Sequence, residues 1–409
     1  MLCHKAMGFK SIVHDMAYLS YTEGPDSWIK FVFHTDDNYY FHKGEALRLK
    51  YKSVVKAKFS IEFVDLEDGQ SAVFAGTRIS RDVSAGFVSM DQRSHIKKVL
   101  RSMGWEDIKE RDVPIIQPFP TADDKPVTAE EKHEASKHPY LETNGNLGWV
   151  SNIHMDVTLA YKLLASRSHD HGKAAWSAMK WLWGYLKKGT YAQLLLRQGP
   201  RNQSNHLQFS VYTDATWNSD PLTRRSMTSY VIMFGQALIC WNCNYLKNVS
   251  KSTTDAEIMA VYAGVMALKS LLNLAKGIGL PPQFRNPVFV DNQRAVDICS
   301  QPLQPGANGH LDAKYFSIRD DVDADIIQLI KIPSADNYAD AIVTYKSKEV
   351  FHRLISAIMG HSPIKPPSAE HSFELAPRSE PLPPNQDIPV SGNSAYPSSL
   401  PTRQETQGE

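Results

Sequence analysis

The order of apolar segments between residues 207 and 346 most constrains the fold. Three short apolar runs come first, and a glycine between the second and third predicts a hairpin. A long segment with apolar residues at helical spacing follows, and then strand-like and helix-like segments alternate. Because parallel neighbouring strands need crossover connections, this order predicts one mixed sheet with helices on its faces. The expected strands are 209–215, 228–235, 237–243, 286–292 and 326–333, and the expected helices are 253–279, 293–300, 310–324 and one opening at 337–343.

Four acidic residues stand at the ends of these expected elements: Asp214, Glu257, Asp291 and Asp340. Strand ends and the facing helix termini converge in an open α/β sheet, so we expect the four side chains to share one cleft. Like charges held together are costly unless a cation neutralises them, and hard oxygen ligands suit Mg²⁺ or Mn²⁺. Two such ions roughly 4 Å apart would serve the hydrolysis of a phosphodiester. The alternative is that these are solvated surface charges among the 44 acidic residues of the chain.

Composition is that of an ordinary globular protein of two to three domains. The 409 residues are 42% hydrophobic and 22% charged, and a formal net charge of +1 leaves nucleic-acid contacts to local basic patches. We find no uninterrupted apolar run of about 18 residues and no apolar leader, which predicts no membrane contact and an intracellular location. Four cysteines are too few for a disulfide framework, and Cys240 and Cys243 lack the second ligand pair that a zinc site needs.

Two segments interrupt the apolar pattern. Residues 112–145 mix proline, glycine and charge, which predicts an extended linker leading into a short helix. From residue 361 the chain is dense in proline, serine and charge, so we expect a disordered tail. A proline-rich ligand for a partner domain is the alternative interpretation of this tail.

The motifs around the four acids resemble the ribonuclease H domain of copia-type LTR retrotransposon Pol polyproteins. They are TDATW at Asp214, TTDAEIMAV at Glu257, FVDNQRAV at Asp291 and NYADAIV at Asp340. The resemblance implies cleavage of the RNA strand of an RNA–DNA hybrid with two Mg²⁺ or Mn²⁺ ions. Asp214 and Asp291 would bridge both ions, and Glu257 would complete one site and orient the 2′-hydroxyl of the RNA. Asp340 would complete the other site.

The resemblance continues upstream and covers nearly the whole chain to about residue 350. His310 and Asp312 match further positions that the family keeps near the site, with an accessory or a fold-supporting role. FVFHTDDNYYF (31–41) resembles the hairpin that carries two metal-facing aspartates in reverse transcriptases, here Asp36 and Asp37 as a polymerase remnant. The implied fold class is α/β and α+β. The implied domains are an incomplete palm and thumb (1–115), a linker and connection region (116–205), a ribonuclease H-like domain with a mixed five-stranded sheet and flanking helices (206–350), and a disordered tail (351–409).

The sequence also departs from the family pattern. His34 stands where the family has the motif tyrosine, and the hairpin begins at residue 31, so the fingers and the first palm aspartate are expected to be missing. This chain alone is therefore not expected to extend a primer, unless a separate chain supplies the missing elements. In the nuclease, Ser229 replaces a usual glycine, but each of the four acids is kept. Two interpretations stay open: an active nuclease, or a degenerate or domesticated remnant that binds nucleic acid without cutting it. An integrase-like nuclease would need its glutamate last, whereas Glu257 comes second.

Basic residues give the candidate nucleic-acid contacts. Lys97, Lys98 and Arg101 share one expected helix, and Arg224 with Arg225 follows the first strand of the nuclease. Tryptophans at helical spacing between residues 176 and 183 are interpreted as core rather than as a base-stacking surface. The expected partner is an RNA–DNA hybrid or other nucleic acid, and the family implies a cytoplasmic virus-like particle or the nucleus as the location.

Overall fold

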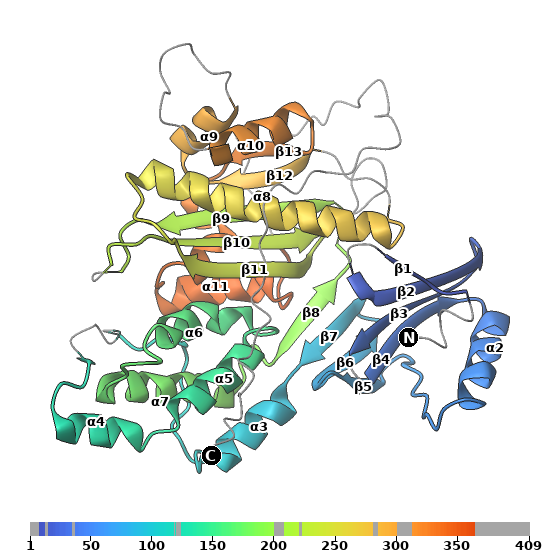
Figure 1. Cartoon of the computed structure of the whole chain (residues 1–409), viewed down its shortest axis with the longest axis horizontal. Helices are drawn as coiled ribbons and strands as arrows, with labels where there is room; N and C mark the ends of the chain where they lie inside the picture. The colour runs from blue at the N-terminus through green and yellow to red at the C-terminus, as the bar shows by residue number, and fades with distance from the viewer. Residues whose placement is uncertain are drawn as a thin grey trace, which may run out of the picture.

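The computed structural model describes most of the chain (Figure 1). The described residues are 8–12, 15–34, 37–117, 119, 124–199, 208–220, 223–280, 285–300 and 313–364. Three predicted site residues, Asp36, His310 and Asp312, lie outside these ranges, and so do residues 365–409 of the predicted tail.

The first sheet is antiparallel and is built from the N-terminal segment. Its strands, in spatial order, are β1 (Lys10–Ile12), β2 (Asp15–Gly24), β3 (Ser27–His34) and β4 (Asp37–Lys43). Helix α2 (Glu45–Lys56) covers one face, because its apolar side packs against buried aromatic and aliphatic residues of β2 and β3. The pairing of His34 with Asp37 confirms a hairpin within residues 31–41.

The second sheet joins segments that are far apart in the sequence. It consists of β5 (Ser71–Phe74), β6 (Thr77–Asp82), β7 (Phe87–Asp91) and β8 (Gln193–Arg197), all antiparallel. Strand β8 therefore pairs with a segment on the other side of the domain boundary placed at residue 115.

A group of helices lies between β7 and β8 in the chain. They are α3 (Arg93–Ser102), α4 (Ala129–Ser136), α5 (Tyr140–Val150), the 3₁₀ helix η2 (Met155–Val157), α6 (Thr158–Ala165) and α7 (Lys173–Lys188). Trp183 is fully buried and Trp176 is 7% exposed, which confirms that these two tryptophans of α7 belong to the core, whereas Trp181 is only partly buried. The last part of the expected linker, residues 112–145, is helical, since it contains α4 and the start of α5, and a short helix is expected there.

The third sheet is mixed, and Asp214 lies on one of its strands. Its strands are β9 (Phe209–Thr216), β10 (Met227–Phe234), β11 (Ala237–Tyr245), β12 (Asn286–Val290) and β13 (Ile327–Lys331). The spatial order is β11-β10-β9-β12-β13, with β9, β10 and β11 antiparallel and β12 parallel to both β9 and β13. This arrangement confirms the mixed five-stranded sheet that the sequence predicts.

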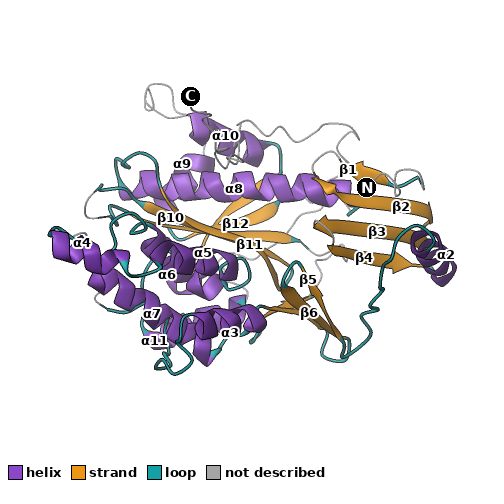
Figure 2. Cartoon of the chain, turned by 60° about the horizontal axis from the view of Figure 1, so that its bottom comes forward, coloured by secondary structure: helices purple, strands orange, loops and turns teal. Residues whose placement is uncertain are grey.

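Helices cover both faces of this sheet (Figure 2). Helix α8 (Thr253–Gly277) lies across β9 and β10, and α9 (Gln293–Ser300) and α10 (Ala313–Asp323) lie on the same side. The opposite face packs against α6, and its buried residues share one core with α7 and α11 (Lys348–Ile358). Neighbouring residues Val211 and Tyr212 are both buried, one on each face, which explains why the strands read as continuous apolar runs. Gly264 allows the close approach of α8, since a Cβ there would lie 2.8 Å from the Thr213 side chain.

Helix α8 has the length and apolar composition of a membrane-spanning helix. The helix is not an uninterrupted apolar run, since Glu257, Lys269 and Asn273 lie within it, so it does not contradict the expectation from the sequence. The most apolar stretch of α8 is 56% buried inside the protein, against the third sheet. A core helix of a folded domain has these same properties.

Two expectations about the C-terminal part also need correction. Asp340 does not open an α-helix, because the segment forms the short 3₁₀ helix η4 (Tyr338–Ile342). The last helix, α11, runs through the boundary placed between residues 350 and 351, so the folded part continues at least to Ile358.

Candidate metal centre

Three carboxylates from three elements meet at one edge of the third sheet. Asp214 is near the end of β9, Asp291 directly follows β12, and Glu257 lies in the second turn of α8. The two strands are parallel neighbours, and Val290 pairs with Thr213, so their carboxyl ends bring the two aspartates together. One ligand oxygen from each of the three side chains lies within 4.8 Å of the others.

The start of α8 is fixed by its own sequence. Ser252 is the N-cap, and its hydroxyl accepts a hydrogen bond from the backbone N–H of Asp255 at 3.1 Å. Glu257 is 7% exposed, and its carboxylate accepts a hydrogen bond from the backbone N–H of Ala215 on β9. Its Oε2 is buried and has no hydrogen-bond partner among the described residues. A buried carboxylate oxygen without a hydrogen-bond donor can act as a ligand of a cation.

Asp340 reaches the same place through a turn anchored to β9. The Asn337 side chain donates to the carbonyl of Thr213 at 2.9 Å and accepts from the N–H of Ala339 at 3.2 Å. The Ser229 hydroxyl donates to the carbonyl of Ala339 at 3.0 Å. These buried contacts hold η4 against the strand that carries Asp214, and the Asp340 side chain forms a hydrogen bond with Asp214.

The structure therefore brings all four predicted acids together. We call Asp214, Glu257, Asp291 and Asp340 the acid cluster. A cation of the protein already contacts one member, since the Lys346 ammonium lies 2.5 Å from Oδ2 of Asp340. The alternative that these are scattered surface charges is wrong, because Asp214 and Glu257 are 6% and 7% exposed.

Burial and the charges of neighbouring acids make two members of the acid cluster, Asp214 and Glu257, hard to ionise. Burial raises the pKa of Asp214 well above its usual range, and the charges of Glu257, Asp291 and Asp340 raise it further. Burial raises the pKa of Glu257 to about 8, with a further contribution from the charge of Asp291. At neutral pH these two carboxyl groups therefore retain protons, unless a cation replaces them.

These residues fit a divalent metal ion. Every donor is a carboxylate oxygen, which Mg²⁺ and Mn²⁺ prefer to nitrogen or sulfur donors. The unpartnered Oε2 of Glu257 gives the site a ligand that no group in the described part of the protein satisfies. Within the described ranges, the three acids nearest to one another form the one group of this kind.

The predicted polymerase remnant does not form a comparable centre among the described residues. Asp37 is exposed at the start of β4, and its carboxylate accepts a hydrogen bond from the backbone N–H of Ala75 at 3.0 Å. This contact links the first sheet to the turn between β5 and β6.

The predicted basic residues are exposed. Lys97, Lys98 and Arg101 lie on α3 on the side opposite its buried residues, and we call them the α3 basic cluster. Arg224 and Arg225 lie in the connection between β9 and β10, at the same end of the sheet as Asp214. Arg224 has a positive φ of 56°, so its backbone is in the left-handed region within this turn.

Three residues around the acid cluster are not predicted as site residues by the sequence. In the sequence, Ser229 stands out only as a departure from the family pattern, although its hydroxyl supports η4. Asn337 precedes Asp340 by three residues, and a polar residue just before a helical turn is a capping signal that could have drawn attention to it. Nothing in the sequence singles out Lys346, because its contact with Asp340 depends on the path of the chain after η4.

The chain has recognisable relatives among retrotransposon proteins, although no family model matches it. The Retrovirus-related Pol polyprotein from transposon TNT 1-94 of Nicotiana tabacum is 26% identical over 368 residues, which cover 87% of this chain and 27% of that protein. The Pol polyprotein from transposon RE2 of Arabidopsis thaliana is 24% identical over 54% of this chain and 15% of its own length. The chain thus spans about a quarter or less of these relatives.

Two solved structures are also similar to part of the chain. An LC11 ribonuclease H1 in complex with an RNA/DNA hybrid is 16% identical, with a TM-score of 0.26 over 33% of this chain and 94% of that one. The N-terminal ribonuclease H domain of a Mycobacterium tuberculosis protein is 13% identical, with a TM-score of 0.23 over 37% of this chain and 98% of that one. Scores this low do not establish a common fold. The relationship rests on the sequence match along 87% of the chain, and by it the protein is a distant homologue of copia-type retrotransposon Pol polyproteins.

Proposed function

We propose that the domain built on the third sheet is a metal-dependent ribonuclease H, which cleaves the RNA strand of an RNA–DNA hybrid. The observation that carries this proposal is the meeting of Asp214, Glu257 and Asp291, with ligand oxygens within 4.8 Å of one another, in a homologue of Pol polyproteins. The strand order of the sheet and the addition of Asp340 from η4 agree with it.

Each acid would have a role that its position supports. Asp214 and Asp291 lie at the ends of adjacent parallel strands, which supports a role in which both would be ligands of the two ions. Glu257 approaches from α8 and would complete one ion site and accept a hydrogen bond from the 2′-hydroxyl. Asp340 approaches from the other side on η4 and would complete the second site. When bound, the ions would supply an activated water and stabilise the charge that develops on the phosphodiester.

The same positions suggest how the substrate would be recognised. A hydrogen bond from the 2′-hydroxyl selects RNA over DNA in the strand that is cut. The exposed Arg224 and Arg225 lie at the same end of the sheet and would contact phosphates of the hybrid. The α3 basic cluster would add contacts that are independent of sequence.

Cleavage of an end-labelled RNA–DNA hybrid tests the proposal. We expect the wild-type chain to cut the RNA strand with Mg²⁺ or Mn²⁺ but not with EDTA, and to leave a DNA duplex of the same sequence intact. Asp291→Asn should abolish this activity because it removes a negative ligand without changing the size of the side chain. Asp325→Asn is the matched control, since Asp325 pairs with Arg285 at the opposite end of β12 and β13.

The alternative is a remnant that binds nucleic acid without cutting it. The ion pair between Lys346 and Asp340 favours this alternative, because it gives one of the acids a partner in the absence of metal. Binding of the hybrid without cleavage in either metal would refute the nuclease and support the remnant. We assign no polymerase activity to the described N-terminal sheets, in which Asp37 serves as a structural hydrogen-bond acceptor.

A further inference from the structure

The members of the acid cluster differ in whether a cation of the protein contacts them. Asp214, Glu257 and Asp291 form a compact group in which Glu257 keeps an unpartnered, buried oxygen. Asp340 instead forms an ion pair with Lys346 at 2.5 Å. The side chains of this pair are 17% and 19% exposed, so water screens the attraction much less than it would at the surface.

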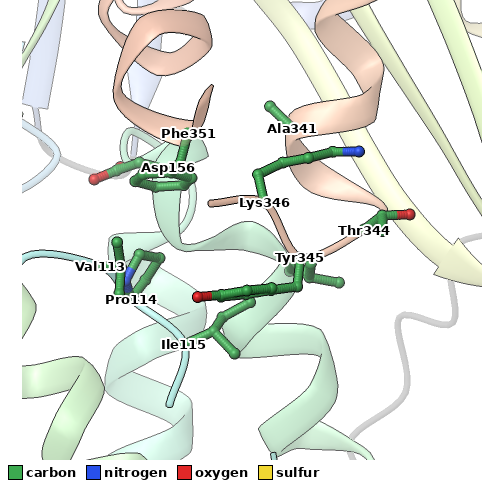
Figure 3. Close-up of a pocket in the computed structure, with 10 residues that line it drawn as sticks. Val113, Pro114, Ile115, Asp156, Ala341, Thr344, Tyr345, Lys346 and Phe351 are labelled. Atoms are coloured by element: carbon green, nitrogen blue, oxygen red, sulfur yellow. The ribbon is translucent and has the colours of Figure 1, made fainter. Parts of the chain in front are cut away.

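The stem of Lys346 is held by its surroundings. It lines a small hollow together with Pro114 from the segment after α3, Tyr345, and Phe351 from α11 (Figure 3). In this view the Lys346 ammonium points away from Asp156, which lies across the hollow, and toward the side of η4. The contacts along the stem favour the position in which the ammonium reaches Asp340.

We propose that Lys346 is an internal counter-ion that competes with the second divalent ion for Asp340. This inference rests on the metal centre of the proposed function. The first ion binds the three compact acids, which lack a cation of their own in the described structure. The second ion binds only when the Lys346 ammonium leaves Asp340, so occupancy of the second site is graded by metal concentration.

Competition of this kind makes a quantitative prediction. Breaking a partly buried ion pair costs more than breaking an exposed pair, and this cost opposes binding of the second ion. Removing the ammonium should therefore tighten the second binding step by about tenfold, which corresponds to about 1.4 kcal/mol. The first binding step should change by much less, because Lys346 forms its ion pair with the fourth acid.

Mn²⁺ titration of the full chain without nucleic acid tests this inference. Calorimetry together with electron paramagnetic resonance counts the bound ions and separates the two steps. We expect one tight and one weak step for the wild type, and a second step about tenfold tighter for Lys346→Met. Lys348→Met is the matched control, since Lys348 is a nearby lysine whose partner is Asp112, and it should titrate like the wild type. An unchanged second step in Lys346→Met would overturn the proposal.

A second variant keeps the test decisive if Lys346→Met does not fold. Lys346→Arg keeps the charge, and its guanidinium can hold a carboxylate through two hydrogen bonds, so the second step should weaken further. A second step that is as tight as in the wild type would again contradict the competition.

The result of the Mn²⁺ titration is independent of the cleavage assay, because the titration uses no nucleic acid. A second binding step that tightens in Lys346→Met, in a protein that does not cut the hybrid, would support the role of Lys346 and refute the nuclease. Normal cleavage by the wild type, together with a second binding step that is unchanged in Lys346→Met, would support the nuclease and refute the role of Lys346.

Discussion

Replacing Glu257 by glutamine should reveal the cost of holding the acid cluster together without metal. The pKa of Glu257 is raised to about 8 in the folded protein, compared with 4.5 for an ordinary glutamate. Between these values the folded state keeps a proton that the unfolded chain has released, so rising pH favours unfolding. The expected loss of stability is about 1.4 kcal/mol per pH unit in this window, and on the order of 5 kcal/mol across it.

Glutamine removes this loss while keeping the local structure. Its amide oxygen still accepts the hydrogen bond from the N–H of Ala215, and its NH₂ group donates toward the neighbouring carboxylates. In EDTA, Glu257→Gln and the wild type should agree within about 1 kcal/mol at pH 5, and the variant should be more stable by several kcal/mol at pH 8. Asp214 has its pKa raised in the same direction, so the variant should retain part of the pH dependence.

Urea unfolding followed by fluorescence at pH 5, 6, 7 and 8 measures this difference. The exposed Glu349 provides the control, because Glu349→Gln should leave the dependence unchanged over this range. Saturating Mg²⁺ at pH 8 should narrow the gap between Glu257→Gln and the wild type, since only the wild type keeps the full ligand set. Equal pH dependence in the two proteins without metal would refute the electrostatic account of the acid cluster.

Three further substitutions test other parts of the structure. Asn337→Ala should lower stability by about 2 kcal/mol in urea unfolding, because it removes the cap of η4 and leaves the buried carbonyl of Thr213 without its donor. An unchanged stability would mean that η4 is held by other contacts. Lys269→Met should cost about 3–5 kcal/mol at pH 7, since it leaves Asp321 buried without its ion-pair partner. Burial already raises the pKa of Asp321, so the loss should shrink toward pH 5, and a loss independent of pH would contradict this reasoning. Alanine at all three positions of the α3 basic cluster should leave stability within about 0.5 kcal/mol. It should reduce the slope of the logarithm of the hybrid-binding constant against the logarithm of salt concentration by about 2–3. If binding measured by fluorescence anisotropy keeps the same slope, the α3 basic cluster does not contact the hybrid.

The nuclease-like sheet is the part of the fold that can be predicted from the sequence. Its central strands are buried on both faces, so they stand out as continuous apolar runs, and α8 shows a clear helical period. Strand ends converge in an open α/β sheet, so the element order also predicts a cleft shared by Asp214 and Asp291, although it does not predict that β9 and β12 are neighbours.

Other features depend on contacts between distant segments. Strand β8 pairs with β7 across more than a hundred intervening residues, and no local pattern indicates such a partner. The 3₁₀ geometry around Asp340 depends on the hydrogen bond from Asn337 to β9, whereas local propensity alone favours an α-helix. The contact of Lys346 with Asp340 follows from that geometry, so it cannot be predicted without it.

Both proposals require that the acid cluster binds divalent metal ions. Anomalous diffraction from crystals of the full chain soaked in Mn²⁺ tests it most directly, because it locates the ions without reference to activity. We predict a strong peak among the side chains of Asp214, Glu257 and Asp291, and a weaker one beside Asp340. Crystals with ordered carboxylates at these positions and no anomalous peak between them would contradict the account.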